Sequence, residues 1–180
     1  MLNTSSSTKP SGSVDPIKIG RGLFPPPVSE FGPLFDAHGM EVRGKKFCLD
    51  FKRYHQLEFD GRLVWVVARA DVPYGERSTR LHVPVGYACS WWYRDMHFDE
   101  RCAADDLWYV CPEYRGRGIG RRLKEETHEI LEKSGVVRIG ENIRYRADAL
   151  GGVPSALMDE LGFEPWGTRW IKKFPGGSGN

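Results

Sequence analysis

Glycine occupies every second position of RGRGIGR, within the segment YVCPEYRGRGIGRRLKEE at residues 109–126. Glycine lets backbone N–H groups come close to a ligand because no Cβ stands in front of them. A helix that begins at such a turn has several unpaired amides and a dipole that favours an anion. Arginines beside the turn add charge-assisted hydrogen bonds. The segment therefore predicts a site for a pyrophosphate group.

The spacing of the glycines separates this segment from two common phosphate-binding motifs. A dinucleotide fingerprint needs a third glycine where Arg121 stands, and a nucleoside-triphosphate loop needs Gly-Lys-Ser/Thr, which the segment lacks. The pattern that fits is R-x-x-G-x-G, at Arg115, Gly118 and Gly120. The alternative is a solvated turn, but arginines in a first helical turn oppose the dipole by about 0.3–1 kcal/mol per charge. A bound anion removes that conflict, and we favour a binding site.

The residues around this segment predict the elements that position it. Continuous β-branched and aromatic residues predict strands at 62–70, 84–94 and 102–110. Apolar side chains at helical spacing predict a helix that begins at Ile119 and that Gly135 ends. The strand predicted at residues 136–147 then runs parallel to the strand before the helix, as in a β-α-β unit.

The remaining segments complete the predicted fold. Residues 29–42 have helical spacing, and an Asp-Gly turn at 60–61 predicts a hairpin whose first arm lies near 47–59. A helix at 153–162 and a strand at 168–174 follow. The sequence thus predicts an α/β (α+β) fold with a mixed, mostly antiparallel central sheet, helices flanking it, and one parallel β-α-β unit.

Length and composition limit the class of protein. The 180 residues fit one domain, which we expect at 21–175, between a disordered tail at 1–20 and a flexible C-terminus at 176–180. No apolar run is long enough to span a membrane, and the polar N-terminus lacks the centre of a secretory signal. The four cysteines show neither CxxC nor metal-ligand spacing, so we expect free thiols, no metal and a cytoplasmic location. A net charge of +2 gives no argument for nucleic acid.

The residues VCPEYRGRGIGRRL, at 110–123, resemble motif A of the GNAT superfamily of N-acetyltransferases, V-x-P-x-Y/F-R/Q-x-x-G-x-G/A. The order of elements agrees from about Arg62 to Phe174, and DELGFEPWGTRWIKKF is similar to the closing helix and strand of that family. The resemblance implies a GNAT-like domain with acetyl-CoA as cofactor. Backbone amides of the glycine-rich turn would hold the pyrophosphate, and the end of the preceding strand would pair with the pantetheine arm. The cofactor-binding residues implied are Trp108, Tyr109, Val110, Arg115, Gly116, Arg117, Gly118, Ile119, Gly120 and Arg121.

The reaction that the resemblance implies is direct attack of an acceptor amine on the acetyl group, helped by a carboxylate base on the strand at 102–110. In this sequence that base is Asp106 or Asp105. Strict strand alternation puts Asp106 on the same face as Trp108 and Val110, and Asp105 on the other. Only one aspartate can then face the acceptor, and we favour Asp106. A solvated edge carboxylate is the alternative.

The sequence departs from the family pattern at the general acid. Many members place a tyrosine in the helix before LGF, where this chain has Met158, which cannot donate a proton. The acid is then Tyr145 or Ser155, or solvent, or absent. The loss of that tyrosine favours one alternative function, a non-catalytic module that binds acyl-CoA.

Aromatic and basic residues leave the acceptor open. Trp91, Trp92 and Tyr93 are either core residues or a wall for a flat acceptor. The three arginines at 138–146 could contact a nucleic acid, although a charged, solvated edge is the usual explanation. A GNAT-like enzyme that modifies nucleobases or DNA is therefore a second alternative. The expected partner is a small-molecule or macromolecule-borne amine, and the resemblance also allows a homodimer.

Overall fold

The computed structural model describes residues 17–24, 26–73, 80–141 and 160–161. The chain divides into two compact units, Met1–Tyr145 and Arg146–Asn180. The fold described below belongs to the first unit. The helix predicted at 153–162 and the strand predicted at 168–174 lie in the second unit and almost entirely outside the described residues.

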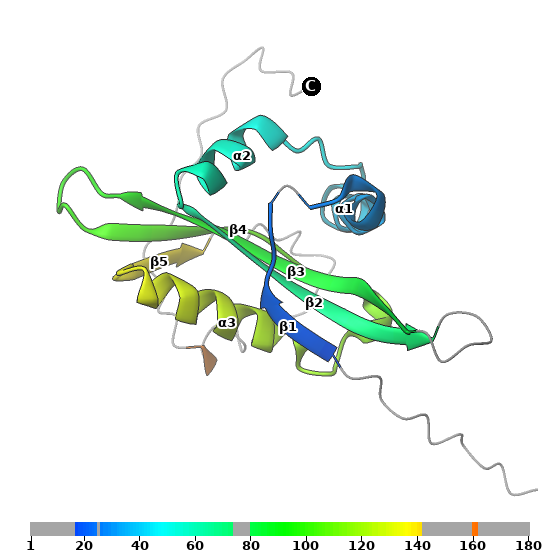
Figure 1. Cartoon of the computed structure of the whole chain (residues 1–180). Helices are drawn as coiled ribbons and strands as arrows, with labels where there is room; N and C mark the ends of the chain where they lie inside the picture. The colour runs from blue at the N-terminus through cyan, green and yellow to red at the C-terminus, as the bar shows by residue number, and fades with distance from the viewer. Residues whose placement is uncertain (1–16, 25, 74–79, 142–159, 162–180) are drawn as a thin grey trace, which may run out of the picture. The chain divides into compact units, whose positions relative to one another are not determined.

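A five-stranded sheet forms the centre of this unit, with its strands side by side in sequence order (Figure 1). The strands are β1 (Ile17–Arg21), β2 (Leu63–Pro73), β3 (Arg80–Arg94), β4 (Arg101–Val110) and β5 (Arg138–Glu141). The first three pairings are antiparallel, and β4 pairs with β5 in parallel. The predicted fold class is confirmed.

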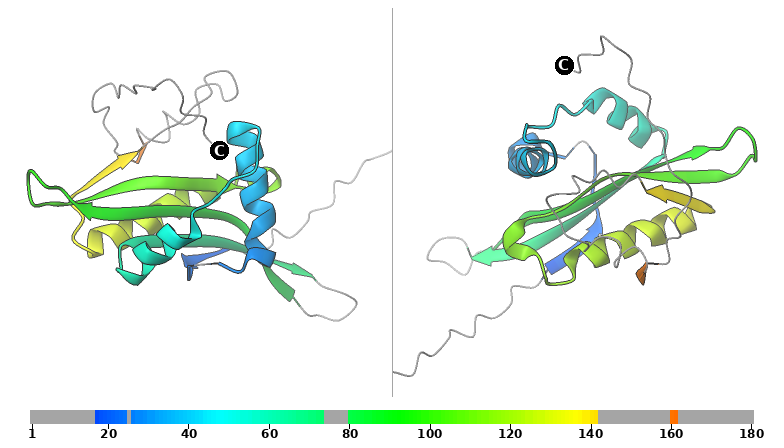
Figure 2. Two further views of the ribbon diagram at one scale, coloured as in Figure 1. Left: turned by 90° about the horizontal axis from the view of Figure 1, so that it is seen from above. Right: turned by 180° about the vertical axis from the view of Figure 1, so that it is seen from behind.

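Helices cover both faces of the sheet, as Figures 1 and 2 show. Helices α1 (Val28–Arg43) and α2 (Phe51–Phe59) lie over one face. Helix α3 (Ile119–Lys133) lies over the other and connects β4 with β5. Among the described residues, no helix is long and apolar enough to cross a membrane.

Successive side chains of the central strands point to opposite faces of the sheet, so each face has its own hydrophobic core. On β2, Val64 and Val66 pack in the core beneath α3, whereas Trp65 and Val67 pack in the core beneath α1 and α2. The α3 core is mostly aliphatic. The core on the opposite face is rich in aromatic rings, which are Phe24, Phe31, Phe35, Trp65, Tyr87 and Tyr109.

Two predictions near the N-terminus are wrong. Residues 17–20, expected to belong to a disordered tail, form β1, because Ile17 and Ile19 pack against the α3 core. The hairpin arm expected near 47–59 is instead α2, which Asp50 caps by accepting a hydrogen bond from the Arg53 amide (3.1 Å).

The β-α-β unit is confirmed in its order and direction. Helix α3 begins at Ile119, buries Leu123 and Leu131, and is followed by Gly135 at φ +78°. The strand predicted at 136–147 is described only as Arg138–Glu141. Its remaining residues lie outside the described part of the chain.

Candidate functional site

The bend between β4 and α3 has the backbone geometry that its glycines suggest. A short 3-10 turn (Pro112–Tyr114) follows β4, and the chain then passes through Gly116 and Gly118, both at φ +72°. Side-chain-bearing residues rarely adopt this conformation. A Cβ added at either glycine would meet nothing within 4 Å, so both positions face open space. The bend is therefore an open turn that requires glycine for its shape.

The amides of this bend are available to a ligand. The first amide of the helix to donate within the chain belongs to Arg122, which bonds the Gly118 carbonyl (3.1 Å). Among the described residues, the amides of 116–120 have no hydrogen-bond acceptor. They lie at the positive end of the α3 dipole, which makes the bend suited to an anion. This geometry fits the pyrophosphate of the cofactor that the sequence implies.

Gly120 and Trp108 pack together behind the bend. A Cβ at Gly120 would stand 3.0 Å from Cζ2 of Trp108, closer than ordinary packing allows. The indole is partly buried in the α3 core, so its ring supports the first turn of the helix. Glycine at 120 thus serves close packing, whereas glycine at 116 and 118 serves the turn.

Arg115 is engaged within the protein. Its Nε donates to the Val110 carbonyl (2.8 Å), and its Nη2 donates to Glu41 of α1 (2.5 Å). Its guanidinium lies 5.5 Å from the centre of the Tyr109 ring, and its own amide donates to Pro112 (3.2 Å). The side chain therefore braces the bend against α1, and the Arg115 amide is committed to the 3-10 turn.

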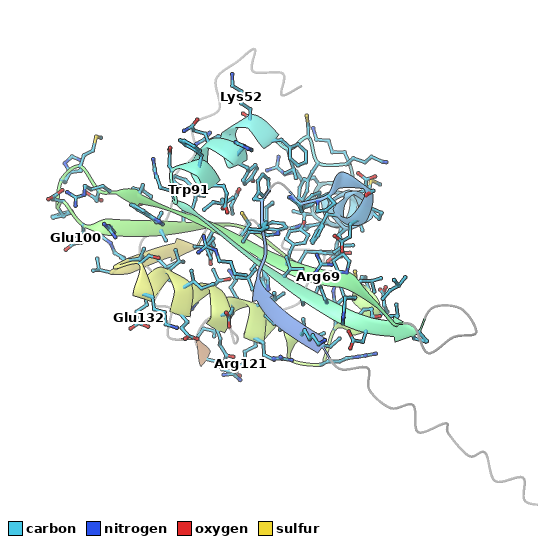
Figure 3. The ribbon with its side chains drawn as sticks, in the orientation of Figure 1. Lys52, Arg69, Trp91, Glu100, Arg121 and Glu132 are labelled. Atoms are coloured by element: carbon cyan, nitrogen blue, oxygen red, sulfur yellow. The ribbon has the colours of Figure 1, made fainter. Side chains whose placement is uncertain are left out.

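The other predicted arginines keep positive charge near the bend. Arg117 donates to the Glu113 carbonyl (3.2 Å) and lies over the ring of Tyr114. Arg121 pairs with Glu125 one turn along α3 (3.1 Å), and in Figure 3 its side chain lies on the side of α3 away from the sheet. Both are exposed, so their charge remains accessible to solvent.

The end of β4 offers an unpaired edge next to the bend. Pairing with β5 is recorded from Cys102 to Asp105 and, within the described residues, goes no further. The Cys111 amide donates to the Val85 carbonyl of β3 (2.9 Å). Because successive amides of a strand point to opposite sides, those of Val110 and Trp108 point away from β3. They can therefore pair with an extended ligand chain.

Tyr109 does not take part in this edge, because its amide points toward β3. Its ring is buried in the aromatic core and stacks on His38 of α1, with centroids 4.9 Å apart. The Nδ1 atom of His38 lies 2.7 Å from the Tyr87 hydroxyl. Burial lowers the pKa of His38 to about 4, so this imidazole is neutral at physiological pH.

An irregularity in β4 changes which face of the sheet Asp106 shares with the residues that follow it. Leu107 pairs with Cys89 and Asp105 pairs with Ser90, which leaves Asp106 as the extra residue of a bulge. Asp106 therefore shares the α1–α2 face with Leu107. The strict alternation that grouped Asp106 with Trp108 and Val110 is wrong, because the bulge shifts the register between Asp106 and Leu107.

Asp106 is exposed and meets a residue that the sequence analysis missed. The hydroxyl of Tyr54, on α2, donates a hydrogen bond to the Asp106 carboxylate. Burial, and then the negative charge of Asp106, raise the pKa of Tyr54, so its hydroxyl stays protonated and remains a donor. The sequence predicts a strand at Tyr54, and no local signal connects this residue with Asp106, 52 residues away.

Asp105 is buried beneath the sheet. It accepts hydrogen bonds from the Ser90 hydroxyl and from Nζ of Lys124 on α3, the latter at 2.5 Å. It therefore cannot reach an acceptor on the α1–α2 face.

The aromatic residues of β3 divide between the two faces. Trp91 and Tyr93 pair on the α2 side with ring centroids 5.4 Å apart, and Figure 3 shows Trp91 between the sheet and α2. Trp92 packs against the α3 core, with the guanidinium of Arg101 4.9 Å from its ring. His97 lies exposed in the β3–β4 turn. Other candidates lie outside the described residues, namely Arg144, Tyr145, Arg146, Ser155 and Met158.

Comparison with models of protein families assigns the chain to one family. Residues 35–146 match the family model described as the Acetyltransferase (GNAT) family. This match includes β2 to β5, α3 and the glycine-rich bend. No curated protein matches the sequence.

Solved structures share the fold at low sequence identity. A ribosomal-protein-alanine N-acetyltransferase from Brucella melitensis biovar Abortus 2308 is 19% identical, with TM-score 0.61 over 88% of this chain and 99% of that one. An aminoglycoside acetyltransferase from an uncultured soil metagenomic sample, in complex with sisomicin, is 18% identical, with TM-score 0.58 over 88% and 93%. AAC(6')-Iy, in complex with the bisubstrate analog CoA-S-monomethyl-acetylneamine, is 13% identical, with TM-score 0.61 over 88% and 98%.

Proposed function

The chain belongs to the GNAT family of acetyltransferases, and from that membership we propose which of its residues carry out the transfer. It is an acetyl-CoA-dependent N-acetyltransferase. When bound, acetyl-CoA would supply the acetyl thioester that an acceptor amine attacks, and the C–S bond would break to release the CoA thiolate. The residues of this chain bind that cofactor, orient the amine and accept its proton.

The bend between β4 and α3 binds the pyrophosphate through its main chain. The amides of residues 116–120, without acceptors among the described residues, supply the donors. The positive φ of Gly116 and Gly118 directs these amides to the open side of the turn. This set of amides at a helix N-terminus is the single observation that carries the proposed site.

The unpaired edge of β4 holds the pantetheine arm. The amides of Trp108 and Val110 point away from β3, toward the side that β5 does not cover within the described residues. A backbone donor at this position also stabilises negative charge that develops on an oxygen near the strand. The edge leads from the bend to Asp106, which puts the reacting atoms at the bulge.

Asp106 is the general base in this proposal. It is exposed on the α1–α2 face, and Tyr54 donates to one of its oxygens, which fixes the orientation of the carboxylate. The amine must be neutral to attack, so Asp106 accepts its proton directly or through a water. Asp105 is excluded because Ser90 and Lys124 occupy its oxygens in the opposite core.

The acceptor is an amine that approaches from the α2 side of the sheet. Structural neighbours are a ribosomal-protein-alanine N-acetyltransferase and aminoglycoside acetyltransferases. These enzymes act on a protein-borne amine and on small-molecule amines, so both kinds belong in an acceptor screen. Trp91 and Tyr93 on this face would form the wall against which the acceptor lies.

Thiol release from acetyl-CoA, measured with a panel of peptides, aminoglycosides and polyamines, tests the assignment of the base. With an active amine, we expect Asp106→Asn to lower kcat about 100- to 1000-fold while acetyl-CoA binding is unchanged. Asp60→Asn is the matched control, because Asp60 is an exposed carboxylate at the end of α2. Unchanged kcat in Asp106→Asn would contradict the assignment. Binding of acetyl-CoA without turnover of any amine would instead favour the non-catalytic module.

A further inference from the structure

A buried ion pair connects α3 with the bulge of β4. Nζ of Lys124 lies 2.5 Å from Oδ2 of Asp105, and the side chains are 2% and 6% exposed. The Ser90 hydroxyl donates to the other carboxylate oxygen, Oδ1. Each oxygen of Asp105 thus has a partner inside a core that is otherwise mostly aliphatic.

Lys124 supplies the positive charge of this cluster. His128, one turn further along α3, interacts with both Asp105 and Lys124, but burial lowers its pKa below the ordinary value. It is therefore neutral near pH 7. The ammonium of Lys124 also lies 5.0 Å from the centre of the Trp108 ring, the ring that supports the bend.

Stability alone is a poor explanation for such a pair. Removing two charges from water costs several kcal/mol per ion, and a buried pair is often no more stabilising than apolar residues of the same volume. Buried charges are better suited to selecting one arrangement among several, because the wrong arrangement leaves a charge unpaired. The alternative arrangements available to β4 are therefore the relevant question.

The two adjacent aspartates give β4 two possible positions for its bulge. In the structure, Asp105 faces α3 with Ala103, while Asp106 and Leu107 both face the opposite side. If the bulge moved one residue toward the N-terminus, Asp106 would face α3, and Ala104 and Asp105 would share the other face. A slip of one residue thus exchanges the carboxylates.

We infer that Lys124 is a positioning residue, which holds Asp105 on the α3 side and thereby turns Asp106 toward the acceptor. This inference rests on the proposed role of Asp106 as the base. Ser90 reinforces the choice, because it offers its hydroxyl on the same side of the sheet. The helix that begins at the pyrophosphate bend thus also determines which carboxylate reaches the amine.

Removing either partner is expected to displace the bulge. In Lys124→Met, Asp105 is left as an unpaired buried carboxylate, which is relieved by turning toward water. In Asp105→Asn, Lys124 loses the carboxylate of Asp105, and a shift of the bulge by one residue would bring the Asp106 carboxylate to the α3 side in its place. In both variants Asp106 loses its orientation, and we expect kcat to fall about 100-fold, as if the base were removed.

When both charges are removed, side-chain packing alone determines the position of the bulge. In the double variant Asp105→Asn, Lys124→Met, no charge is buried and the side-chain amide introduced on β4 can still bond Ser90, so the observed bulge is favoured again. We expect kcat within about fivefold of the parent, far from the product of the two single effects. KM for acetyl-CoA should change by less than about threefold in all three variants, since the bend keeps its amides.

The test is a double-mutant cycle on the full chain. It measures kcat, KM and, by urea unfolding, the folded fraction of each variant. Lys133→Met is the matched control, because Lys133 is an exposed lysine of the same helix. A purely structural pair would lower stability in the single variants and leave kcat per folded molecule unchanged. If one single variant fails to fold, the kcat per folded molecule of the other single variant tests the inference.

Three outcomes overturn the inference. The first is a folded single variant whose kcat equals that of the parent. The second is a double variant whose kcat is as low as that of the single variants. The third is a single variant in which KM for acetyl-CoA rises while kcat is unchanged. Asp106→Asn, measured alongside, separates the two proposals. Parental kcat in that variant removes the base assignment, whereas its loss of activity together with active single variants removes only the role of Lys124.

Discussion

The two faces of the sheet differ in the residues that form their cores and in the groups that form their candidate sites. Beneath α3 the core is mostly aliphatic, and the anion site that we propose beside it consists of backbone amides within one continuous turn. Beneath α1 and α2 the core is aromatic, and the proposed base, Asp106, accepts a hydrogen bond from Tyr54 of α2. One face thus presents a site made by main chain, and the other a site made by side chains.

This difference indicates how each site depends on its neighbours. Amides at a helix start keep their direction as long as the turn keeps its φ angles, so few side chains matter there. A carboxylate on a strand depends on the register of that strand, and Asp106 also accepts a hydrogen bond from Tyr54 on α2. In our inference its orientation depends on Lys124 of α3 as well, through Asp105. Substitutions should therefore affect cofactor binding through backbone geometry and acetyl transfer through packing.

The largest expected effect on cofactor binding comes from Gly118→Val, which places a β-branched residue at φ +72°. We expect the affinity for acetyl-CoA to fall about 100-fold, because the strained turn can no longer aim its amides at one anion. Isothermal titration calorimetry measures this change.

Gly135→Val provides the control at the opposite end of α3, where φ is +78°. Both variants should lose about 2 kcal/mol of unfolding free energy from the same backbone strain. Only the first should lose affinity for acetyl-CoA. Equal affinity in the two variants would mean that the bend does not bind the cofactor.

The next largest effect concerns the pH dependence of stability, to which the neutral His38 of the aromatic core contributes. The unfolded chain takes up a proton on this histidine below about pH 6.5, whereas the folded chain does so only near pH 4. Falling pH therefore favours unfolding, and the contribution of His38 from pH 7 to pH 5 is about 2 kcal/mol.

Urea unfolding at several pH values checks this contribution. His38→Asn keeps a side-chain acceptor for the Tyr87 hydroxyl and cannot titrate, so its unfolding free energy should change less between pH 7 and pH 5. An identical pH dependence in parent and variant would show that His38 takes up its proton equally in both states.

Tyr54→Phe should lower kcat about tenfold, less than loss of the base itself, because Asp106 keeps its position on the strand and loses one orienting hydrogen bond. Steady-state kinetics with a saturating amine measure the change. Tyr114→Phe, which removes a tyrosine hydroxyl on the α3 side of the sheet, should stay near the parent. If the affinity for acetyl-CoA fell while kcat was unchanged, Tyr54 would contribute to cofactor binding and not to the orientation of the base.

The smallest effect is expected at Arg115, whose guanidinium binds Glu41 and the Val110 carbonyl. Arg115→Gln and Glu41→Gln should each weaken acetyl-CoA binding by no more than about threefold, since the partly exposed pair braces the turn and does not form it. Calorimetry on both variants distinguishes the two roles. A loss above about 50-fold in Arg115→Gln alone would indicate direct contact with phosphate.

The same contrast explains what could be predicted from sequence. The glycine turn, α3 and the strands beside it follow from residues that are neighbours in the chain, so their period and spacing were informative. Helix α2 carried a local signal that was overlooked, the cap at Asp50 with Phe51, Tyr54 and Leu57 spaced along one face.

The bulge carried no such signal. Strict alternation is the default for a strand, and we infer that the contacts of Asp105 with Ser90 and Lys124 help to set the register of β4 against β3. These contacts join residues 15 and 19 positions apart in the sequence. Which of two adjacent aspartates faces the acceptor is therefore a property of the folded core.

The central claim, that main-chain amides of the β4–α3 bend hold the pyrophosphate, is tested most directly by NMR. Titrating labelled protein with CoA while following the amide signals of Gly116, Gly118 and Gly120 reports on those donors alone. We predict that these three signals move further than the other glycine amides and saturate together with CoA binding. Saturable binding that leaves them in place, while amides elsewhere shift, would contradict the account.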